Sequence, residues 1–140
     1  MQDNQSNCGP FALKNALAAL GIERSAEELE KACGTTATRG TSVRNLVRAA
    51  GKIEGCDAVL LREKRSDVAL LKLEHAVAAG RPVLITWSTE EPGDHWVAVV
   101  GALGDRYLVA DSADSELVLS YTAGELEAKW RDSSYEGVIL

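Results

Sequence analysis

Two apolar runs fill residues 95–111, which read HWVAVVGALGDRYLVAD. Runs of this length, rich in valine and broken by a glycine, are typical of two strands joined by a tight turn. A third run of the same kind covers residues 116–121, so the three together predict an antiparallel meander. This meander decides the fold class, because the segments before it must pack against the sheet that it forms.

Upstream of the meander, most apolar residues recur at helical spacing. Capping residues and glycines mark where such helices begin and end. We expect helices from Cys8 to Leu20, over 25–34, over 41–51 with Thr41 or Ser42 as the cap, over 67–79 and over 122–130, and further strands over 57–61, 83–87 and 135–140. Helices followed by antiparallel strands form the α+β class, with the helices packed on one side of the sheet.

The size and charge of the chain narrow the function classes. Its 140 residues, 46% hydrophobic and 26% charged, predict a single domain over residues 1–140. Fifteen Lys and Arg against 21 Asp and Glu give a net charge of −6, which disfavours nucleic acids and anionic membranes as partners. The chain contains no apolar run of the ~20 residues that a membrane span needs and no signal-peptide core. We therefore expect a cytoplasmic protein, or a soluble piece of a larger one.

The cysteines give the first candidate for chemistry. Three of them, Cys8, Cys33 and Cys56, are widely spaced, and there are only two histidines, so neither a disulfide framework nor a zinc site is predicted. Cys8 stands at the expected N-terminus of the first helix, where the helix dipole stabilises a thiolate. The alternative is that Cys8 simply fills the start of the helix. The other two cysteines have no such setting and are expected to be structural.

A cysteine nucleophile needs a base, and His95 is the better candidate. His75 falls within a predicted helix, whereas His95 opens a strand directly after a polar loop. A turn at residues 103–104 places His95 opposite Asp111 or Ser112 and on the same face as Asp111, so that the carboxylate can orient the imidazole. The same alternation turns Trp96 toward the core. An exposed histidine at a strand end, and an aspartate that merely begins a turn, are the alternatives.

Three segments carry a family resemblance: residues 2–10 (QDNQSNCGP), 94–101 (DHWVAVVG) and 107–112 (YLVADS). Together they resemble the papain-like cysteine peptidases, most closely the bacteriocin-processing family that removes double-glycine leader peptides. Members carry a glutamine six residues before a Cys-Gly pair, a histidine that opens a hairpin, and an aspartate about sixteen residues later. Gln2, Cys8, His95 and Asp111 match these positions, and the resemblance extends over nearly the whole chain.

The resemblance implies a papain-like fold in which N-terminal helices carry the nucleophile and pack on a C-terminal antiparallel sheet. It also implies a cysteine peptidase that forms a thioester on Cys8, with a peptide or protein as substrate, no cofactor and no metal, and a place in a larger secretion or processing system. In this mechanism His95 takes the thiol proton, Asp111 orients His95, and Gln2 stabilises the oxyanion. Two other functions remain open: a transpeptidase or acyltransferase that uses the same site, and a peptide-binding module without catalysis.

Overall fold

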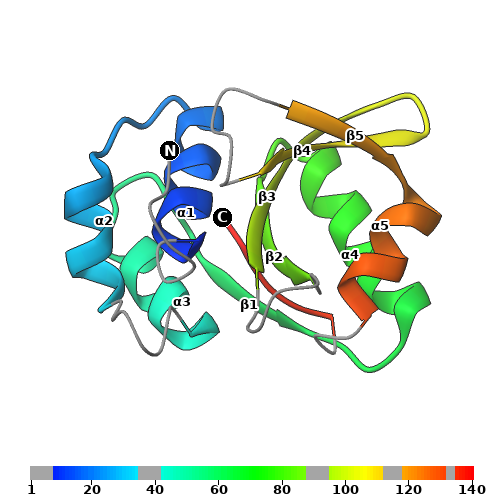
Figure 1. Cartoon of the computed structure of the whole chain (residues 1–140), viewed down its shortest axis with the longest axis horizontal. Coiled ribbons are helices and arrows are strands. Elements are labelled where there is room, and N and C mark those ends of the chain that lie inside the picture. Colours follow the sequence, from blue (N-terminus) through cyan, green and yellow to red (C-terminus); the bar gives the residue numbers. More distant parts are fainter. Residues whose placement is uncertain (1–7, 35–41, 88–94, 112–117, 132–134) are drawn as a thin grey trace.

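The computed structural model of the protein describes residues 8–34, 42–87, 95–111, 118–131 and 135–140. Helices predominate at the start and strands toward the end, as the sequence predicts (Figure 1). The elements in chain order are α1 (Cys8–Ala19), α2 (Ala26–Cys33), α3 (Val43–Gly51), β1 (Val59–Arg62), α4 (Ser66–Ala78), β2 (Val83–Trp87), β3 (His95–Leu103), β4 (Arg106–Asp111), β5 (Val118–Thr122), α5 (Ala123–Trp130) and β6 (Glu136–Ile139).

Side-chain caps fix the starts of three helices where the sequence predicts them. The hydroxyl oxygens of Ser25, Ser42 and Thr122 each accept a hydrogen bond of 3.2 Å from the backbone N–H three residues later. Thr122 completes a capping box, because the Glu125 carboxylate accepts from the backbone N–H of Thr122 at 2.9 Å. Each cap satisfies a donor that the first helical turn leaves unpaired.

The sheet is antiparallel throughout and has the strand order β1-β6-β2-β3-β4-β5. The predicted meander is confirmed as β3, β4 and β5. The last strand, β6, lies between β1 and β2, which precede it in the chain. Gly137 permits this insertion, because a Cβ atom there would lie 2.5 Å from the backbone oxygen of Leu84.

Several contacts hold the start of β6. Tyr135 has a φ of 52°, a left-handed conformation that is unusual for an aromatic residue. Its ring packs edge-on against Trp130 with 5.4 Å between centroids, and its hydroxyl donates to Glu127 at 3.0 Å. The indole N–H of Trp130 in turn donates to the backbone oxygen of Glu136 at 3.0 Å. These contacts fix the direction in which the chain leaves α5 and enters the sheet.

The expectation that the helices pack on one side of the sheet is wrong. Helices α1, α2 and α3 cover one face, while α4 and α5 cover the other (Figure 1). Alternate residues of each central strand are therefore divided between two buried clusters: Trp96 and Ala98 face α1–α3, and Val97 and Val99 face α4 and α5. Because both faces are covered, residues 83–86 of β2 and 95–99 of β3 are buried without interruption.

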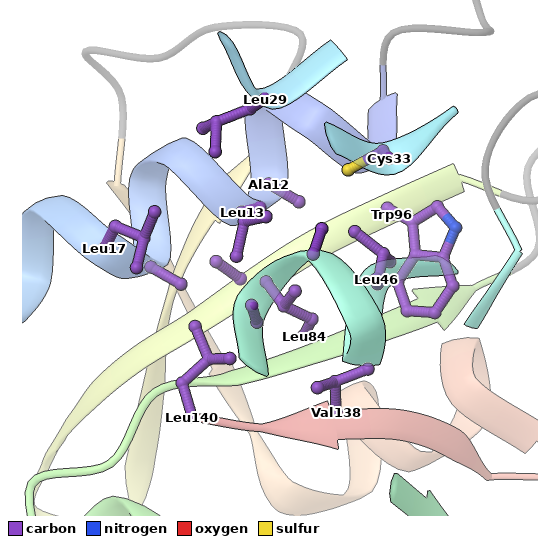
Figure 2. Close-up of a cluster of buried hydrophobic side chains, with 14 of the residues drawn as sticks. Ala12, Leu13, Leu17, Leu29, Cys33, Leu46, Leu84, Trp96, Val138 and Leu140 are labelled. Atoms are coloured by element: carbon purple, nitrogen blue, oxygen red, sulfur yellow. The ribbon is translucent and has the colours of Figure 1, made fainter. Parts of the chain in front are cut away.

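Trp96 belongs to the core, as strand alternation predicts. Its exposed fraction is 3%, and it packs in the cluster formed by α1–α3 with the sheet. In Figure 2, Trp96 lies beside Leu46 of α3, while Leu17 of α1 lies at the far side of the cluster. The direction of α1 follows from this arrangement: its first turn is at the Trp96 side, and its last turn points away from it.

Within the described residues, no helix combines the length and the apolar character that a membrane crossing requires.

Candidate active site

His95 and Asp111 meet at one end of the sheet. His95 is the first residue of β3 and Asp111 is the last residue of β4. Because these strands are antiparallel, both residues lie at the same end of the sheet. The Nε2 atom of His95 is 2.8 Å from Oδ1 of Asp111. His95 is only 7% exposed, so this contact is largely shielded from water. The predicted contact between these two side chains is confirmed.

The strand register behind this contact differs from the predicted one. Val97, not His95, lies opposite Asp111, and an irregularity between Val99 and Gly101 shifts the pairing by one residue. The difference arises at the turn, which is formed by Gly104 and Asp105 so that Leu103 pairs with Arg106, and the bulge at Val100 then moves the pairing one residue back toward the predicted register. His95 therefore reaches Asp111 diagonally, two residues away along the same face, a separation that long side chains span.

The contact determines which nitrogen of His95 can act as a base. An ionised carboxylate only accepts hydrogen bonds, so the proton of the neutral ring resides on Nε2. Nδ1 is then the nitrogen with the lone pair, and it is the atom suited to take a proton from a nucleophile. Asp111 also favours the imidazolium that such a transfer creates.

The pKa of a further residue, Tyr121 on β5, is affected by the charge of Asp111. Burial, followed by the negative charges of Asp111 and Glu125, raises the pKa of Tyr121. The ammonium nitrogen of Lys129 lies 5.9 Å from the centre of the Tyr121 ring. The sequence interpretation did not identify Tyr121; its position beside β4 becomes visible only once the pairing of β4 with β5 is known.

Cys8 is the first residue of α1, as predicted. The residues that follow it, from Gly9 to Leu13, are all buried, so the N-terminal end of this helix lies within the protein. Unpaired backbone N–H groups at such an end stabilise an anion, including a thiolate. Since α1 begins at the Trp96 side of the cluster, its first turn is directed toward the end of β3 that carries His95 (Figure 2).

The remaining candidates have different settings. Gln2 lies outside the described residues. His75 is exposed on α4, in keeping with its exclusion as a base. Burial raises the pKa of the Cys33 thiol to about 12, although Arg48 opposes the shift, and burial also raises the pKa of Cys56. Both thiols are therefore protonated near neutral pH, which disfavours a nucleophilic role.

The described part of the chain contains no group of three or more His, Cys, Asp or Glu residues that could hold a metal ion.

Comparison with solved structures identifies the fold. The peptidase domain of Streptococcus ComA, a bifunctional ABC transporter involved in a quorum-sensing pathway, superposes with a TM-score of 0.75 at 18% identity, over 98% of this chain and 92% of that domain. A double-glycine-motif protease from an AMS/PCAT transporter, in complex with the leader peptide, has a TM-score of 0.72 at 21% identity, over 99% and 86%.

A C39-like peptidase from Bacillus anthracis also shares the fold, with a TM-score of 0.72 at 18% identity over 96% of this chain and 88% of that one. No curated protein sequence matches this chain significantly. The sequence model of the peptidase C39-like family, in contrast, matches residues 1–138. The fold and the resemblance expected from the sequence are thereby confirmed, and the chain belongs to the peptidase C39-like family.

Proposed function

We propose that this protein is a cysteine peptidase in which Cys8 is the nucleophile, His95 the general base, Asp111 the residue that orients His95, and Gln2 an oxyanion donor. The observation that carries the proposal is the buried contact between His95 Nε2 and Asp111 Oδ1 at 2.8 Å. Membership of the peptidase C39-like family supports the same reaction class.

In the first half of the proposed reaction, Nδ1 of His95 takes the proton of the Cys8 thiol, and the sulfur attacks the carbonyl carbon of the scissile peptide bond. The carbonyl π electrons move to oxygen and form a tetrahedral oxyanion. The side-chain amide of Gln2 and the backbone N–H of Cys8 donate hydrogen bonds to this oxygen. The oxyanion then collapses, the carbon–nitrogen bond breaks, and His95 gives its proton to the departing amine.

In the second half, a water molecule loses a proton to His95 and attacks the thioester carbonyl. The carbon–sulfur bond breaks, the acid product leaves, and the thiol regains its proton from His95. Asp111 holds the imidazole in one tautomer through both halves and stabilises its charged form. The two histidine nitrogens thus have separate tasks, one toward Asp111 and one toward the reacting groups.

We further propose a leader peptide that ends in two glycines as the substrate, cleaved within a larger secretion or processing system. The support is the resemblance of residues 2–10 and 94–101 to the leader-processing peptidases and the likeness in fold to a double-glycine-motif protease. Because glycine has no side chain, a scissile Gly-Gly segment lets the backbone of the peptide substrate approach the reacting groups closely.

The nucleophile can be tested without a substrate, by alkylation with iodoacetamide followed by intact-mass and peptide-mass analysis. We expect Cys8 to react much faster than the other cysteines at pH 6–7, below the ordinary thiol pKa of about 8.5. Cys33 and Cys56 serve as internal controls, since burial raises the pKa of both. Equal labelling of all three cysteines in the folded protein contradicts the assignment.

The acceptor of the acyl group is decided by product analysis with a Gly-Gly peptide. Incubation in H₂¹⁸O with and without an added amine distinguishes hydrolysis from acyl transfer by the mass of the product. We expect hydrolysis, which places ¹⁸O in the new carboxylate. An amide product formed with the added amine in place of the acid identifies the protein as an acyltransferase that uses the same site.

A further inference from the structure

A cavity of about 460 Å³, the hairpin cavity, lies at the end of the sheet opposite to His95. It is bounded by the last turns of α4, by the tip of the hairpin that joins β3 to β4, and by the first residue of α5. Because β3 rises by about 3.3 Å per residue from His95 to Leu103, this tip lies about 26 Å from the candidate active site. The volume is in the range of pockets that bind small ligands, and the proposed peptidase reaction makes no use of it.

Apolar and aromatic groups form much of the wall of the hairpin cavity. Val77 of α4, Ala102 of β3 and Ala123 of α5 contribute small apolar side chains. Tyr107 of β4 contributes a half-buried phenol ring, which belongs to the layer between the sheet and helices α4 and α5. Burial, followed by the negative charge of Glu74, raises the pKa of Tyr107. The Glu74 carboxylate and the neutral phenol are therefore close enough to interact.

The uncompensated charge in the hairpin cavity is negative. Glu74 and Asp105 line it with exposed side chains, and neither forms an ion pair within the described part of the chain. Arg106 also lines the cavity, but its guanidinium donates to the hydroxyl and the backbone oxygen of Ser120 and lies 3.5 Å from a carboxylate oxygen of Glu125. The charge of Arg106 is thus compensated within the protein, whereas the two carboxylates can accept a positive charge from outside.

A cavity of similar size between α1 and the start of α2 lacks this asymmetry. Its volume is about 440 Å³, and its lining contains Lys14 and Arg24 together with Glu23 and Glu28. Two cations and two carboxylates balance one another there. The hairpin cavity therefore differs both from this cavity and from carboxylates on the open surface, because it combines an apolar wall, an aromatic ring and unpaired negative charge.

We propose that the hairpin cavity binds an alkyl chain that ends in an ammonium or guanidinium group, supplied by a basic side chain of a partner protein or by a free amine. The methylene groups of such a chain cover the apolar wall, and its charged end pairs with the carboxylates of Glu74 and Asp105. The aromatic ring of Tyr107 adds a further attraction for the cation. Both carboxylates repel an anion, and a neutral apolar ligand gains nothing from them. This site does not depend on the proposed peptidase function.

The test uses n-pentylamine as the cationic probe and n-pentanol as its neutral counterpart of the same length. Binding to the ¹⁵N-labelled protein is followed in ¹H–¹⁵N correlation spectra, which report on the backbone amides of residues 74–78 and 102–107. The variant E74Q/D105N removes both carboxylates with little change in shape. The variant E23Q/E28Q removes the same charge from the cavity between α1 and α2 and is the matched control. Thermal melting checks the fold of each variant.

We expect n-pentylamine to give saturable shifts around the hairpin cavity and n-pentanol to bind about threefold or more weakly. In E74Q/D105N the Kd of n-pentylamine should rise about three- to tenfold, because each exposed carboxylate contributes modestly, and high salt should weaken binding to wild type. E23Q/E28Q should keep the wild-type Kd. Absence of saturable shifts at the hairpin cavity, equal binding of the two probes, or equal losses in the two variants overturns the inference. If E74Q/D105N does not fold, the comparison of the two probes on wild type at low and high salt still decides.

A second pair of probes separates the two sources of the cation. One is a capped pentapeptide with a central lysine between alanines, and the other carries the uncharged norleucine in place of the lysine. Tighter binding of the lysine peptide than of n-pentylamine identifies a basic side chain of a partner protein as the ligand, and tighter binding of n-pentylamine identifies a free amine. Either result supports the site if the affinity falls in E74Q/D105N, and equal binding of the two peptides together with no binding of n-pentylamine overturns it.

Discussion

Replacement of Asp111 by asparagine tests the contact on which the candidate site depends. The substitution keeps the size and shape of the side chain but removes its charge, at a point where the side chains of His95 and Asp111 are only 9% and 23% exposed. If asparagine turns its oxygen toward Nε2, the histidine tautomer is retained without the charge. If it turns its amide N–H₂ toward Nε2, the ring proton is forced onto Nδ1, and His95 can no longer accept a proton there.

The size of the effect follows from the hydrogen bond that is lost. A partly buried hydrogen bond to a charged group contributes about 1.5–3 kcal/mol. This energy applies when His95 is charged during turnover, so kcat should fall by about 10- to 100-fold while KM changes little. Turnover is measured by mass spectrometry on a Gly-Gly peptide, with thermal melting as the check on folding. H75A, on an exposed face of α4, is the matched histidine control and should retain full activity.

An Asp111→Asn variant with wild-type kcat and wild-type melting temperature refutes the role assigned to this contact. A loss of activity in H75A that is absent in H95A identifies a different base.

Three further predictions concern other parts of the chain. Gln2→Ala should lower kcat by about 10²-fold with little change in KM, whereas Gln5→Ala should have no effect; the opposite result in peptide kinetics means that the wrong glutamine was chosen. Gly137→Ala should destabilise the fold by about 1–3 kcal/mol, read as a lower urea midpoint, because its Cβ would lie 2.5 Å from the Leu84 oxygen; an unchanged midpoint contradicts this close approach. Thr122→Ala should cost about 1 kcal/mol by removing the cap of α5, and an equal effect of Thr122→Ser, which keeps the hydroxyl, argues against capping.

Local signals in the sequence predicted the elements well because their causes are local. Ser25, Ser42 and Thr122 cap helices through contacts only three residues away. The two faces of β3 follow from simple alternation, which correctly separated Trp96 from Val97. His95 and Asp111 could be brought together for the same reason, since they belong to neighbouring strands of one hairpin.

Features that depend on distant residues were missed. The hairpin turn lies at Gly104 and Asp105, later than the expected centre, and no signal in the sequence marks the extra residue at Val100. The placement of helices on both faces was overlooked, although continuous apolar runs such as residues 83–85 and 96–100 indicate strands buried on both sides. The position of β6 depends on pairing with strands more than fifty residues earlier, and only Gly137 hints at the close approach.

The place of β6 in the sheet has a consequence for biosynthesis. Val59 in β1 pairs with Ile139, which lies far later in the sequence, and among the described strands β1 joins the rest of the sheet only through β6. A ribosome makes the chain from the N-terminus, so helices α1–α3 emerge long before Val138 and Leu140, which complete the core beneath them. The helix that carries the candidate nucleophile therefore stays incompletely packed until residues 136–140 have been made, and the sheet is completed only when β6 is in place.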